Sequence, residues 1–340
     1  MKVLITGGAG YIGSHTLLEV IKAGHTVVVV DSLINGHAEA IKRVSKLTGT
    51  DIKLAVGDIR DKAFLDSIFT EFAPASVIHF AGLKAVGESV ENPMAYYDVN
   101  VSGSKVLLEV MQSHGCNKIV FSSSATVYGE PQYLPYDENH PVAPINPYGR
   151  TKLIVEQMLG DWSAVDKKRS AISLRYFNPV GAHPSGLMGE DPLGRPENLM
   201  PFIAQVAVGT RSELQIFGDD YDTRDGTGER DYLHVVDLAE AHVLSLTALA
   251  DHAGHDVINI GTGNGVTVKE MVKAFEIACG RSITTSSVAR RSGDLPSFYA
   301  NSERAQSRLG WSAKLGIEDM CKDAWVWQSQ NPRGYKVSEC

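Results

Sequence analysis

A glycine-rich segment near the N-terminus constrains the fold more than any other feature of the chain. Residues 6–13 read TGGAGYIG and lie between a short apolar run, residues 2–6, and an amphipathic helical pattern. Glycine lets the backbone turn tightly, and the free amides at the start of the following helix attract a phosphate group. The strand, turn and helix together predict a dinucleotide-binding unit, whereas a glycine triplet alone would indicate only a tight turn. The three glycines are Gly7, Gly10 and Gly13.

Short apolar runs alternate with amphipathic stretches through the first half of the chain. We expect strands at residues 2–6, 26–31, 52–56, 76–81, 117–123 and 170–176, with helices between them. Such alternation predicts parallel βαβ units with right-handed crossovers and helices on both faces of the sheet. The expected fold class is therefore α/β, a Rossmann-type doubly wound parallel sheet whose ligand lies at the carboxyl ends of the strands.

The pattern loosens after about residue 178 into segments rich in Gly and Pro. We expect residues 1–177 to form the dinucleotide-binding domain and residues 178–340 to form a smaller α/β lobe that binds the substrate. A clear strand near residues 256–261 would run back into the main sheet. The two lobes are thus expected to interleave rather than to divide at one linker.

Composition and charge exclude several classes of function. The 340 residues carry a formal net charge of -8, which does not favour nucleic acid or anionic membranes as partners. We expect no membrane helix, because no apolar stretch approaches the ~20 residues that one needs. A strand at residues 2–6 leaves no room for a secretory leader. The four cysteines have no metal-ligand spacing, so we expect reduced thiols, no metal and a soluble cytoplasmic protein.

A second marker of dinucleotide binding stands at the end of the next strand. Asp31 follows residues 26–30 about 20 residues after the glycines, where a carboxylate can accept hydrogen bonds from the adenosine ribose. Asp31 would repel a 2′-phosphate, so it favours NAD over NADP. The alternative is an ordinary turn residue at a strand end. The following strand ends at Asp58 and Ile59, which we expect beside the adenine.

Tyr148 and Lys152 form the candidate catalytic pair. Residues four apart on a helix share a face, so we expect the Lys152 ammonium to lie beside the Tyr148 phenol and to favour its ionised form. An accidental solvated helix face would show the same spacing. Two strand ends, residues 79–84 and 121–129, are expected to face a nicotinamide, and the second contributes the hydroxyl of Ser124. Together these features indicate a nicotinamide-dependent enzyme.

The combined motifs resemble the extended short-chain dehydrogenase/reductase family from end to end. Within it, the chain is similar to members that invert carbon 4 of UDP-linked sugars, in residues 79–89, 121–129, 175–184 and 226–235. The resemblance implies one tightly held NAD and reversible conversion of UDP-galactose to UDP-glucose through a transient 4-keto sugar. It also implies a homodimer that pairs through residues near 93–113 and 149–165. Apolar positions there are equally compatible with core that faces the sheet.

The resemblance also implies roles for individual residues. The catalytic residues are Tyr148, which takes the proton from sugar O4, Ser124, which hydrogen-bonds the same oxygen, and Lys152. The cofactor contacts are Gly7, Gly10, Tyr11, Ile12, Gly13, Asp31, Asn35, Asp58, Ile59, Phe80, Ala81, Lys84, Ser122, Tyr148, Lys152, Tyr176 and Phe177. The substrate contacts are Ser124, Tyr148, Asn178, Asn198, Leu199, Phe217, Arg230, Arg291, Asp294 and Phe298.

The residue types suit these roles. Two arginines can neutralise a diphosphate, and Phe217 can stack on uracil. Arg230 stands between two acidic residues, so a solvated ion pair is its alternative. Asn100 is expected to position a helix rather than to bind a ligand.

Phe298 bears on which sugar fits the site. The family members that this chain resembles carry at this position either a small residue, which admits N-acetylated sugars, or a tyrosine, which restricts them. A phenylalanine ring should crowd a 2-acetamido group. We therefore expect a preference for UDP-glucose and UDP-galactose over their N-acetylated forms.

Two other functions remain open from the sequence. A nucleotide-sugar 4,6-dehydratase shares the fold, the cofactor and the first hydride step, but it needs a further acid and base. The positions that supply them in that group hold Ala125 and Thr126 here. A regulator that binds NAD without catalysis would need neither Tyr148 nor Lys152.

Overall fold

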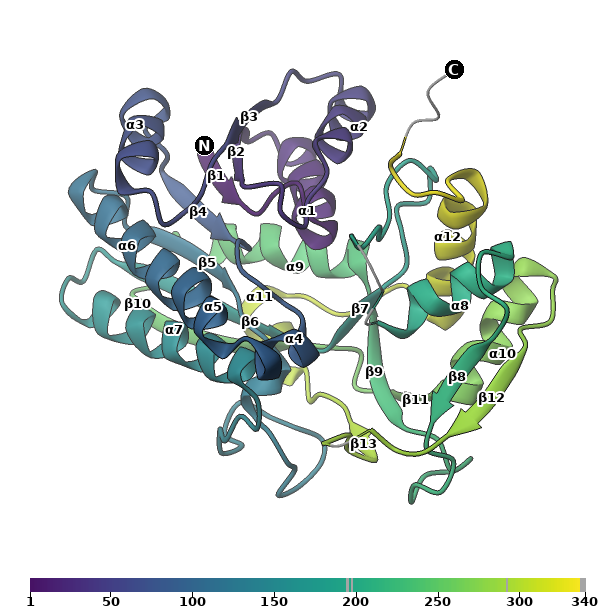
Figure 1. Cartoon of the computed structure of the whole chain (residues 1–340). Helices are drawn as coiled ribbons and strands as arrows, with labels where there is room; N and C mark the ends of the chain where they lie inside the picture. The colour runs from purple at the N-terminus through teal and green to yellow at the C-terminus, as the bar shows by residue number, and fades with distance from the viewer. Residues whose placement is uncertain (194–195, 197, 292, 337–340) are drawn as a thin grey trace.

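A seven-stranded parallel sheet forms the centre of the molecule in the computed structural model (Figure 1). The structure describes residues 1–193, 196, 198–291 and 293–336. The strands, in spatial order, are β10 (Gly254–Ile260), β6 (Ser170–Tyr176), β5 (Lys118–Ser122), β4 (Ser76–His79), β1 (Lys2–Thr6), β2 (Thr26–Asp31) and β3 (Lys53–Val56). The predicted α/β class and all six predicted strands are confirmed. The strand expected near residues 256–261 does return to the sheet, beside β6.

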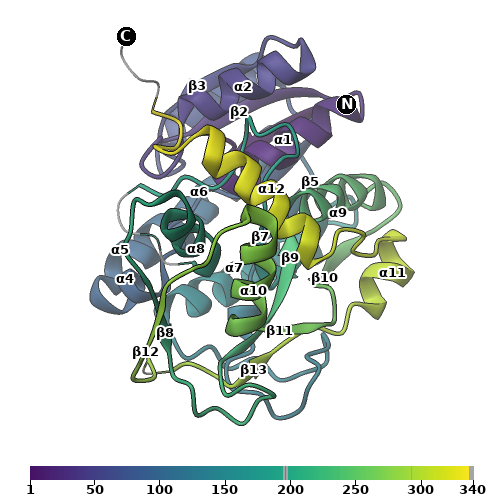
Figure 2. The same cartoon turned by 90° about the vertical axis from the view of Figure 1, so that its right-hand side faces the viewer.

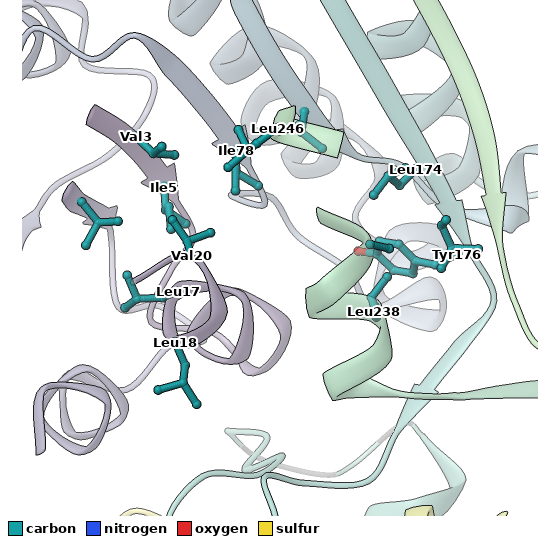
Figure 3. Packing of buried hydrophobic residues seen from close by; sticks show 14 of the residues in the cluster. Val3, Ile5, Leu17, Leu18, Val20, Ile78, Leu174, Tyr176, Leu238 and Leu246 are labelled. Atoms are coloured by element: carbon teal, nitrogen blue, oxygen red, sulfur yellow. The ribbon is translucent and has the colours of Figure 1, made fainter. Parts of the chain in front are cut away.

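Helices cover both faces of this sheet. One face packs against α1 (Tyr11–Lys22), α2 (Ala38–Thr48), α9 (Val235–Ala248) and α11 (Glu303–Leu309). The other packs against α3 (Lys62–Phe72), α6 (Gly103–Ser113) and α7 (Pro147–Ala164). Successive strand residues point to opposite faces, so Val3 and Ile5 join the first core and Leu4 joins the second. Figure 3 shows the first core, where Leu17 and Val20 of α1 lie against β1.

A smaller lobe is built on the second half of the chain (Figure 2). Its four-stranded sheet consists of β7 (Asn178–Val180), β9 (Glu229–His234), β11 (Gly265–Thr267) and β13 (Ser297–Phe298). A separate two-stranded sheet pairs β8 (Leu214–Phe217) with β12 (Thr285–Val288). The helices of this lobe are α8 (Leu199–Val208), α10 (Val268–Cys279) and α12 (Ile317–Gln330). The three helices pack on one another around a separate apolar core. Thr267 and Glu270 form a capping box that fixes the start of α10.

An irregular helical segment connects β4 to α6. It comprises α4 (Val86–Glu91), α5 (Pro93–Tyr96) and the π-helix η1 (Tyr97–Ser102). Asn100 lies in η1 and is buried. Its side chain accepts from Leu83 N at 2.7 Å and donates to Leu83 O and to Thr151 Oγ1, each at 3.0 Å. Asn100 thus ties the loop after β4 to α7, which is the positioning role expected from the sequence.

The described residues show neither a membrane-spanning helix nor a metal-binding cluster. None of the helices there has the length and apolar character required to cross a bilayer. No group of three or more His, Cys, Asp or Glu side chains in the described part of the chain is placed to hold a metal ion. Cys116, Cys279 and Cys321 are free thiols, and Cys340 lies outside the described residues.

Candidate active site

The glycine turn joins β1 to α1 at the carboxyl edge of the sheet. Gly7 has a φ of 72°, and a Cβ atom there would lie 2.6 Å from Ala81 N. A Cβ atom at Gly13 would lie 2.2 Å from Gly7 O. The packing of the protein itself therefore requires these two glycines. At Gly10, the N-cap residue of α1, a Cβ atom would meet only Gly7 O, at 3.3 Å. The backbone at Gly10 is thus open to close approach, which fits the pyrophosphate of a dinucleotide.

Asp31 lies beside this turn and is buried. Its Oδ2 accepts a hydrogen bond from Ala9 N at 2.9 Å, and its Oδ1 accepts one from Leu33 N at 2.8 Å. Burial raises the pKa of the carboxyl, and the two backbone hydrogen bonds oppose that rise. Asp31 therefore fastens the loop after β2 to the glycine turn, as the turn-residue alternative expected. A carboxylate has about four acceptor positions, so ribose hydroxyls can still be bound.

Three further residues predicted to contact the cofactor follow the ends of β2 and β3. Asp58 is held by Arg60, whose Nε lies 3.0 Å from Asp58 Oδ1, and this contact lowers the pKa of Asp58. Ile59 is buried, and a Cβ atom at Gly103 would lie 2.6 Å from its Cδ1. Asn35 is exposed. The sequence did not single out Arg60, although it stands two residues after Asp58.

Three further cofactor candidates connect elements around the site. The Ser122 and Tyr176 hydroxyls hydrogen-bond one another across β5 and β6. Tyr11 donates its hydroxyl to Gly181 O at 2.7 Å, which joins the start of α1 to the chain after β7. The buried or half-buried remainder is Ile12, Phe80, Ala81 and Phe177.

The catalytic pair lies at the start of α7. Asn146 caps this helix by accepting from Gly149 N at 2.8 Å, and Pro147 occupies its first position. Tyr148 and Lys152 are both buried. The Lys152 ammonium donates to Ser122 O at 2.7 Å and lies 5.7 Å from the centre of the Tyr148 ring.

Burial dominates the acid–base properties of this pair. It raises the pKa of Tyr148 to about 12, and a hydrogen bond from Ser124 lowers that value only in part. It lowers the pKa of Lys152 to about 8, while the charge of Glu156 acts in the opposite direction. In the protein alone the pKa of Tyr148 thus stands above its ordinary value, because desolvation of the phenol outweighs the hydrogen bond from Ser124. That Lys152, together with the positive nicotinamide, favours the ionised phenol stays a prediction.

Ser124 is oriented by a neighbour that the sequence did not single out as a functional residue. Ser124 is the N-cap of the short 3₁₀ helix η2 (Ala125–Val127). Its Oγ accepts from Thr126 N at 3.2 Å and from Thr126 Oγ1 at 3.0 Å. A serine hydroxyl has two lone pairs and one proton, so the Ser124 proton is left to point at Tyr148. A hydroxyl two residues after Ser124 is the sequence signal that could have identified Thr126.

Two pairs of predicted substrate residues meet in the smaller lobe. Arg230 Nη2 lies 3.5 Å from Asp294 Oδ1, and Arg230 Nη1 donates to Leu295 O at 2.8 Å. The guanidinium of Arg291 lies 3.8 Å from the centre of the Phe217 ring. The first pair joins β9 to Asp294 and the second joins β8 to Arg291, so the lobe carries two cations and an aromatic ring at these contacts.

The alternative interpretation, in which Arg230 forms a solvated ion pair with Glu229 or Asp231, is wrong. Glu229 instead pairs with Arg224. Asp231 is fully buried, and its Oδ1 accepts from Thr262 Oγ1 at 2.6 Å. Both neighbouring carboxylates are therefore engaged elsewhere, and Arg230 turns to Asp294.

Glu190 joins a predicted cofactor residue to a predicted substrate residue. Its Oε1 lies 3.4 Å from Lys84 Nζ and accepts from Asn198 Nδ2 at 2.8 Å. Asn198 and Lys84 thus meet at one carboxylate although they come from different lobes. The sequence did not single out Glu190. The last two substrate candidates, Asn178 and Leu199, are half-buried.

Phe298 belongs to an aromatic wall beside the catalytic residues. Its ring centre lies 4.9 Å from that of Tyr136 and 5.0 Å from that of Phe177. The same cluster includes Ala125, which directly follows Ser124. Phe298 is therefore held by packing, close to the residues that would contact the sugar.

Comparison with known proteins identifies the family. The family model described as GDP-mannose 4,6 dehydratase matches residues 4–324. The UDP-glucose 4-epimerase of Bacillus subtilis is 52% identical over 339 residues, which cover 100% of both chains. The chain belongs to the UDP-glucose 4-epimerases.

Solved structures of the same family agree with this assignment. The UDP-glucose 4-epimerase from Bifidobacterium longum in complex with NAD+ and UDP superposes with a TM-score of 0.95 at 50% identity, covering 98% of this chain and 100% of that one. The one from Stenotrophomonas maltophila, with bound NAD and formylated UDP-arabinopyranose, gives a TM-score of 0.96 at 49% identity and covers 98% and 99%. The predicted membership of the extended short-chain dehydrogenase/reductase family is confirmed.

The site geometry agrees with a UDP-glucose 4-epimerase rather than a dehydratase. Elimination of water requires an acid and a base in addition to the catalytic tyrosine. Ala125 has no titratable group and is fully buried. The Thr126 hydroxyl is engaged with Ser124. Neither position can exchange protons near neutral pH.

Proposed function

We propose that this chain interconverts UDP-galactose and UDP-glucose by inverting carbon 4 of the sugar with bound NAD. The observation that carries the proposal is the cluster of Tyr148, Ser124 and Lys152 beside an open glycine cradle, in a chain that is 52% identical to a UDP-glucose 4-epimerase over its full length. Residues 1–177 and the returning strand would hold NAD. Residues 178–340 would hold the UDP-sugar.

The reaction follows from what these side chains can do. NAD, when bound, supplies an acceptor for the hydride of C4, a positive charge beside the phenol, and the same hydride for the return step. Tyr148 takes the proton of O4, and Ser124 hydrogen-bonds the same oxygen. The resulting 4-keto sugar turns its other face by rotating about its link to the diphosphate. Tyr148 then returns the proton to O4, so no net oxidation occurs.

The remaining residues bind and orient the two ligands. Gly10 and the start of α1 would hold the NAD pyrophosphate, and Asp31 the adenosine ribose. Arg230 and Arg291 would neutralise the UDP diphosphate, and Phe217 would stack on uracil.

Turnover of UDP-galactose by the purified protein tests this proposal. We expect UDP-glucose to form without added NAD, because a reaction without net oxidation never has to release its cofactor. Separation of the two UDP-sugars by chromatography measures the conversion. No conversion, even after NAD is added, would contradict the proposed function.

Gly10→Ala is expected to weaken NAD binding while leaving the fold intact. The added methyl group would meet only Gly7 O, at 3.3 Å, so we expect the Tm to change by no more than about 2 °C. The same methyl would stand where the pyrophosphate approaches the backbone, and we expect the Kd for NAD to rise about 10-fold or more. Isothermal titration calorimetry on the NAD-stripped protein measures it.

Gly316→Ala is the matched control for Gly10→Ala. Gly316 is the N-cap residue of α12, and its Cβ would meet Glu318 Oε2 at 3.2 Å. The same substitution at an N-cap outside the proposed NAD site should leave the NAD affinity unchanged. Equal losses of affinity in both variants would contradict the role given to Gly10.

A preference among sugars is expected from Phe298. Because neighbouring aromatic rings hold Phe298 in place, it cannot easily move aside for a 2-acetamido group. We expect kcat/KM for UDP-galactose to exceed that for UDP-N-acetylgalactosamine by about 100-fold, and Phe298→Ala to narrow the ratio by about 10-fold. Parallel assays with both sugars measure the ratio, and Phe72→Ala, at a half-buried position on α3, is the control. Equal turnover of both sugars by the unaltered protein would show that Phe298 does not restrict the site.

We also propose a cytoplasmic homodimer. Val90 and Met94 are 64% and 67% exposed on α4 and α5, and both helices pack against α7. A partner copy that covers these side chains would remove them from water. The molecular mass in solution, from light scattering, tests the dimer.

The buried cysteines support a cytoplasmic location. Burial raises the pKa of Cys116 to about 11 and that of Cys321 to about 12, as suits inert thiols of a reducing compartment.

A further inference from the structure

One face of α7 holds three consecutive residues at the end of β5, here called the serine turn (residues 122–124). Tyr148, Lys152 and Glu156 follow one another at intervals of one helical turn, so they line one face of the helix. The contacts are Tyr148 with the Ser124 hydroxyl, Lys152 with Ser122 O at 2.7 Å, and Glu156 Oε1 with the Ser123 hydroxyl. Each helical turn therefore fixes one residue of the serine turn.

Glu156 is fixed in turn by an arginine of β6. Arg175 Nε and Nη2 donate to Glu156 Oε1 at 2.9 Å and Oε2 at 2.5 Å, and both side chains are buried. The guanidinium also lies 4.8 Å from the centre of the Tyr128 ring. A buried ion pair of this kind gains little net stability, because its desolvation cost offsets the attraction. Its presence directly behind the catalytic residues is better explained by what it holds in place.

The charge of Glu156 acts on Lys152 as well. Burial lowers the pKa of Lys152 to about 8, and Glu156 opposes that effect. Arg175 neutralises Glu156 from the side of β6. In the described part of the chain, the titratable groups that interact with Lys152 or Glu156 are Tyr148 on α7, His79 on β4, Arg175 on β6 and His255 on β10. His79 is buried and His255 is half-buried, and burial lowers the pKa of each.

We propose that Glu156, fastened by Arg175, is a positioning residue: it sets the serine turn against Tyr148 and places a carboxylate one helical turn from the Lys152 ammonium. The proposal deepens the proposed function and rests on it, because the roles of Ser124, Tyr148 and Lys152 come from that function. Glu156 itself touches neither the proposed substrate nor NAD.

Glu156→Gln tests the proposal because it keeps the size of the side chain and an acceptor for Ser123 but removes the charge. We expect kcat at pH 7 to fall by about 10-fold or more, with KM for UDP-galactose within about twofold. The loss of activity at alkaline pH should begin about one pH unit lower. A direct readout is the pH titration of Lys152 by NMR of protein with ¹³C at the lysine Cε, which should shift in the same direction.

Two further variants separate positioning from stability. Glu156→Gln with Arg175→Met removes the unpaired arginine, and it decides the question if the single variant fails to fold. Glu138→Gln is the control, because the Glu138 side chain is only 5% exposed, lies 3.6 Å from Arg304 Nε and accepts from Asn259 N at 2.7 Å. Glu138→Gln should alter the Tm but neither the pH profile nor the Lys152 titration.

The outcomes are distinct. Loss of activity at a lower pH and a lower pKa of Lys152 in the Glu156 variants support the proposal. A wild-type pH profile and Lys152 titration in the double variant would overturn it and leave the ion pair a structural role. Failure of the unaltered protein to convert UDP-galactose would contradict the proposed function instead, while the Lys152 titration would still test Glu156.

Discussion

Tyr148→Phe is expected to lower kcat for the conversion of UDP-galactose to UDP-glucose by about 10³-fold, the middle of the range that general acid–base catalysis typically contributes. The phenol oxygen is the group proposed to take and return the O4 proton. The ring itself is buried, so phenylalanine preserves its packing. We therefore expect the Tm and the content of bound NAD to stay close to those of the unaltered protein. Conversion without added NAD, followed by chromatography, measures the loss.

Tyr128→Phe provides the matched control. Tyr128 is also buried and donates its hydroxyl to Asn259 Oδ1 at 2.6 Å, but it lies behind the serine turn with Arg175 over its ring. Loss of that hydrogen bond should cost about 1 kcal/mol of stability and leave kcat within a few-fold. If Tyr148→Phe retained more than a tenth of the activity, Tyr148 could not be the group that exchanges the O4 proton.

Lys152→Met is expected to reduce both kcat and NAD retention, kcat by about 10²-fold or more. Methionine is of similar length but removes the ammonium that Ser122 O accepts from at 2.7 Å. The pKa of Lys152 is about 8, below the ordinary lysine value, so the ammonium is present below pH 8 and is lost as the pH rises through it. Activity of the unaltered protein should decline above about that pH, and Lys152→Met should not show this decline. A pH series of kcat, with NAD content measured alongside, tests both expectations.

Lys105→Met serves as the control for Lys152→Met. Lys105 is exposed on α6 and pairs with Glu109, a surface contact of little energetic consequence. Its replacement should change neither the pH series nor the NAD content. If both lysine variants lost kcat and NAD content to a similar extent, the cause would be a general effect of lost positive charge.

Local patterns in the chain predicted the features that depend on neighbouring residues. The strand ends, the glycine turn and the pair Tyr148 and Lys152 are set by spacings of a few residues, and the structure has them where the sequence indicated. Contacts between distant segments could not be read in this way. Lys84 and Glu190 are 106 residues apart, and their meeting depends on how the smaller lobe packs on the main sheet.

The raised pKa of Tyr148 in the protein alone could not be read from the sequence for a different reason. Helical spacing places two side chains on one face but does not tell how deeply that face is buried. Desolvation depends on burial, and here it outweighs the hydrogen bond that Tyr148 receives from Ser124. Glu156 could have been noticed, because it continues the spacing from Tyr148 and Lys152 by one more turn. A buried charge at that position needs Arg175, which only the folded sheet supplies.

The return of β10 to the main sheet has a consequence for the order in which the protein is made. β6 contributes Arg175 and Tyr176 to the site, and its pairing with β5 can form once residue 176 has left the ribosome. Its other edge pairs with β10, in the register Ser170 with Gly254 to Tyr176 with Ile260, and stays open until residue 260 is synthesised. An unpaired strand edge invites association with other chains. The nascent protein therefore carries its catalytic tyrosine, lysine and serine for a considerable period before the strand that completes their sheet exists, and a chain stopped within residues 177–253 would be prone to aggregate.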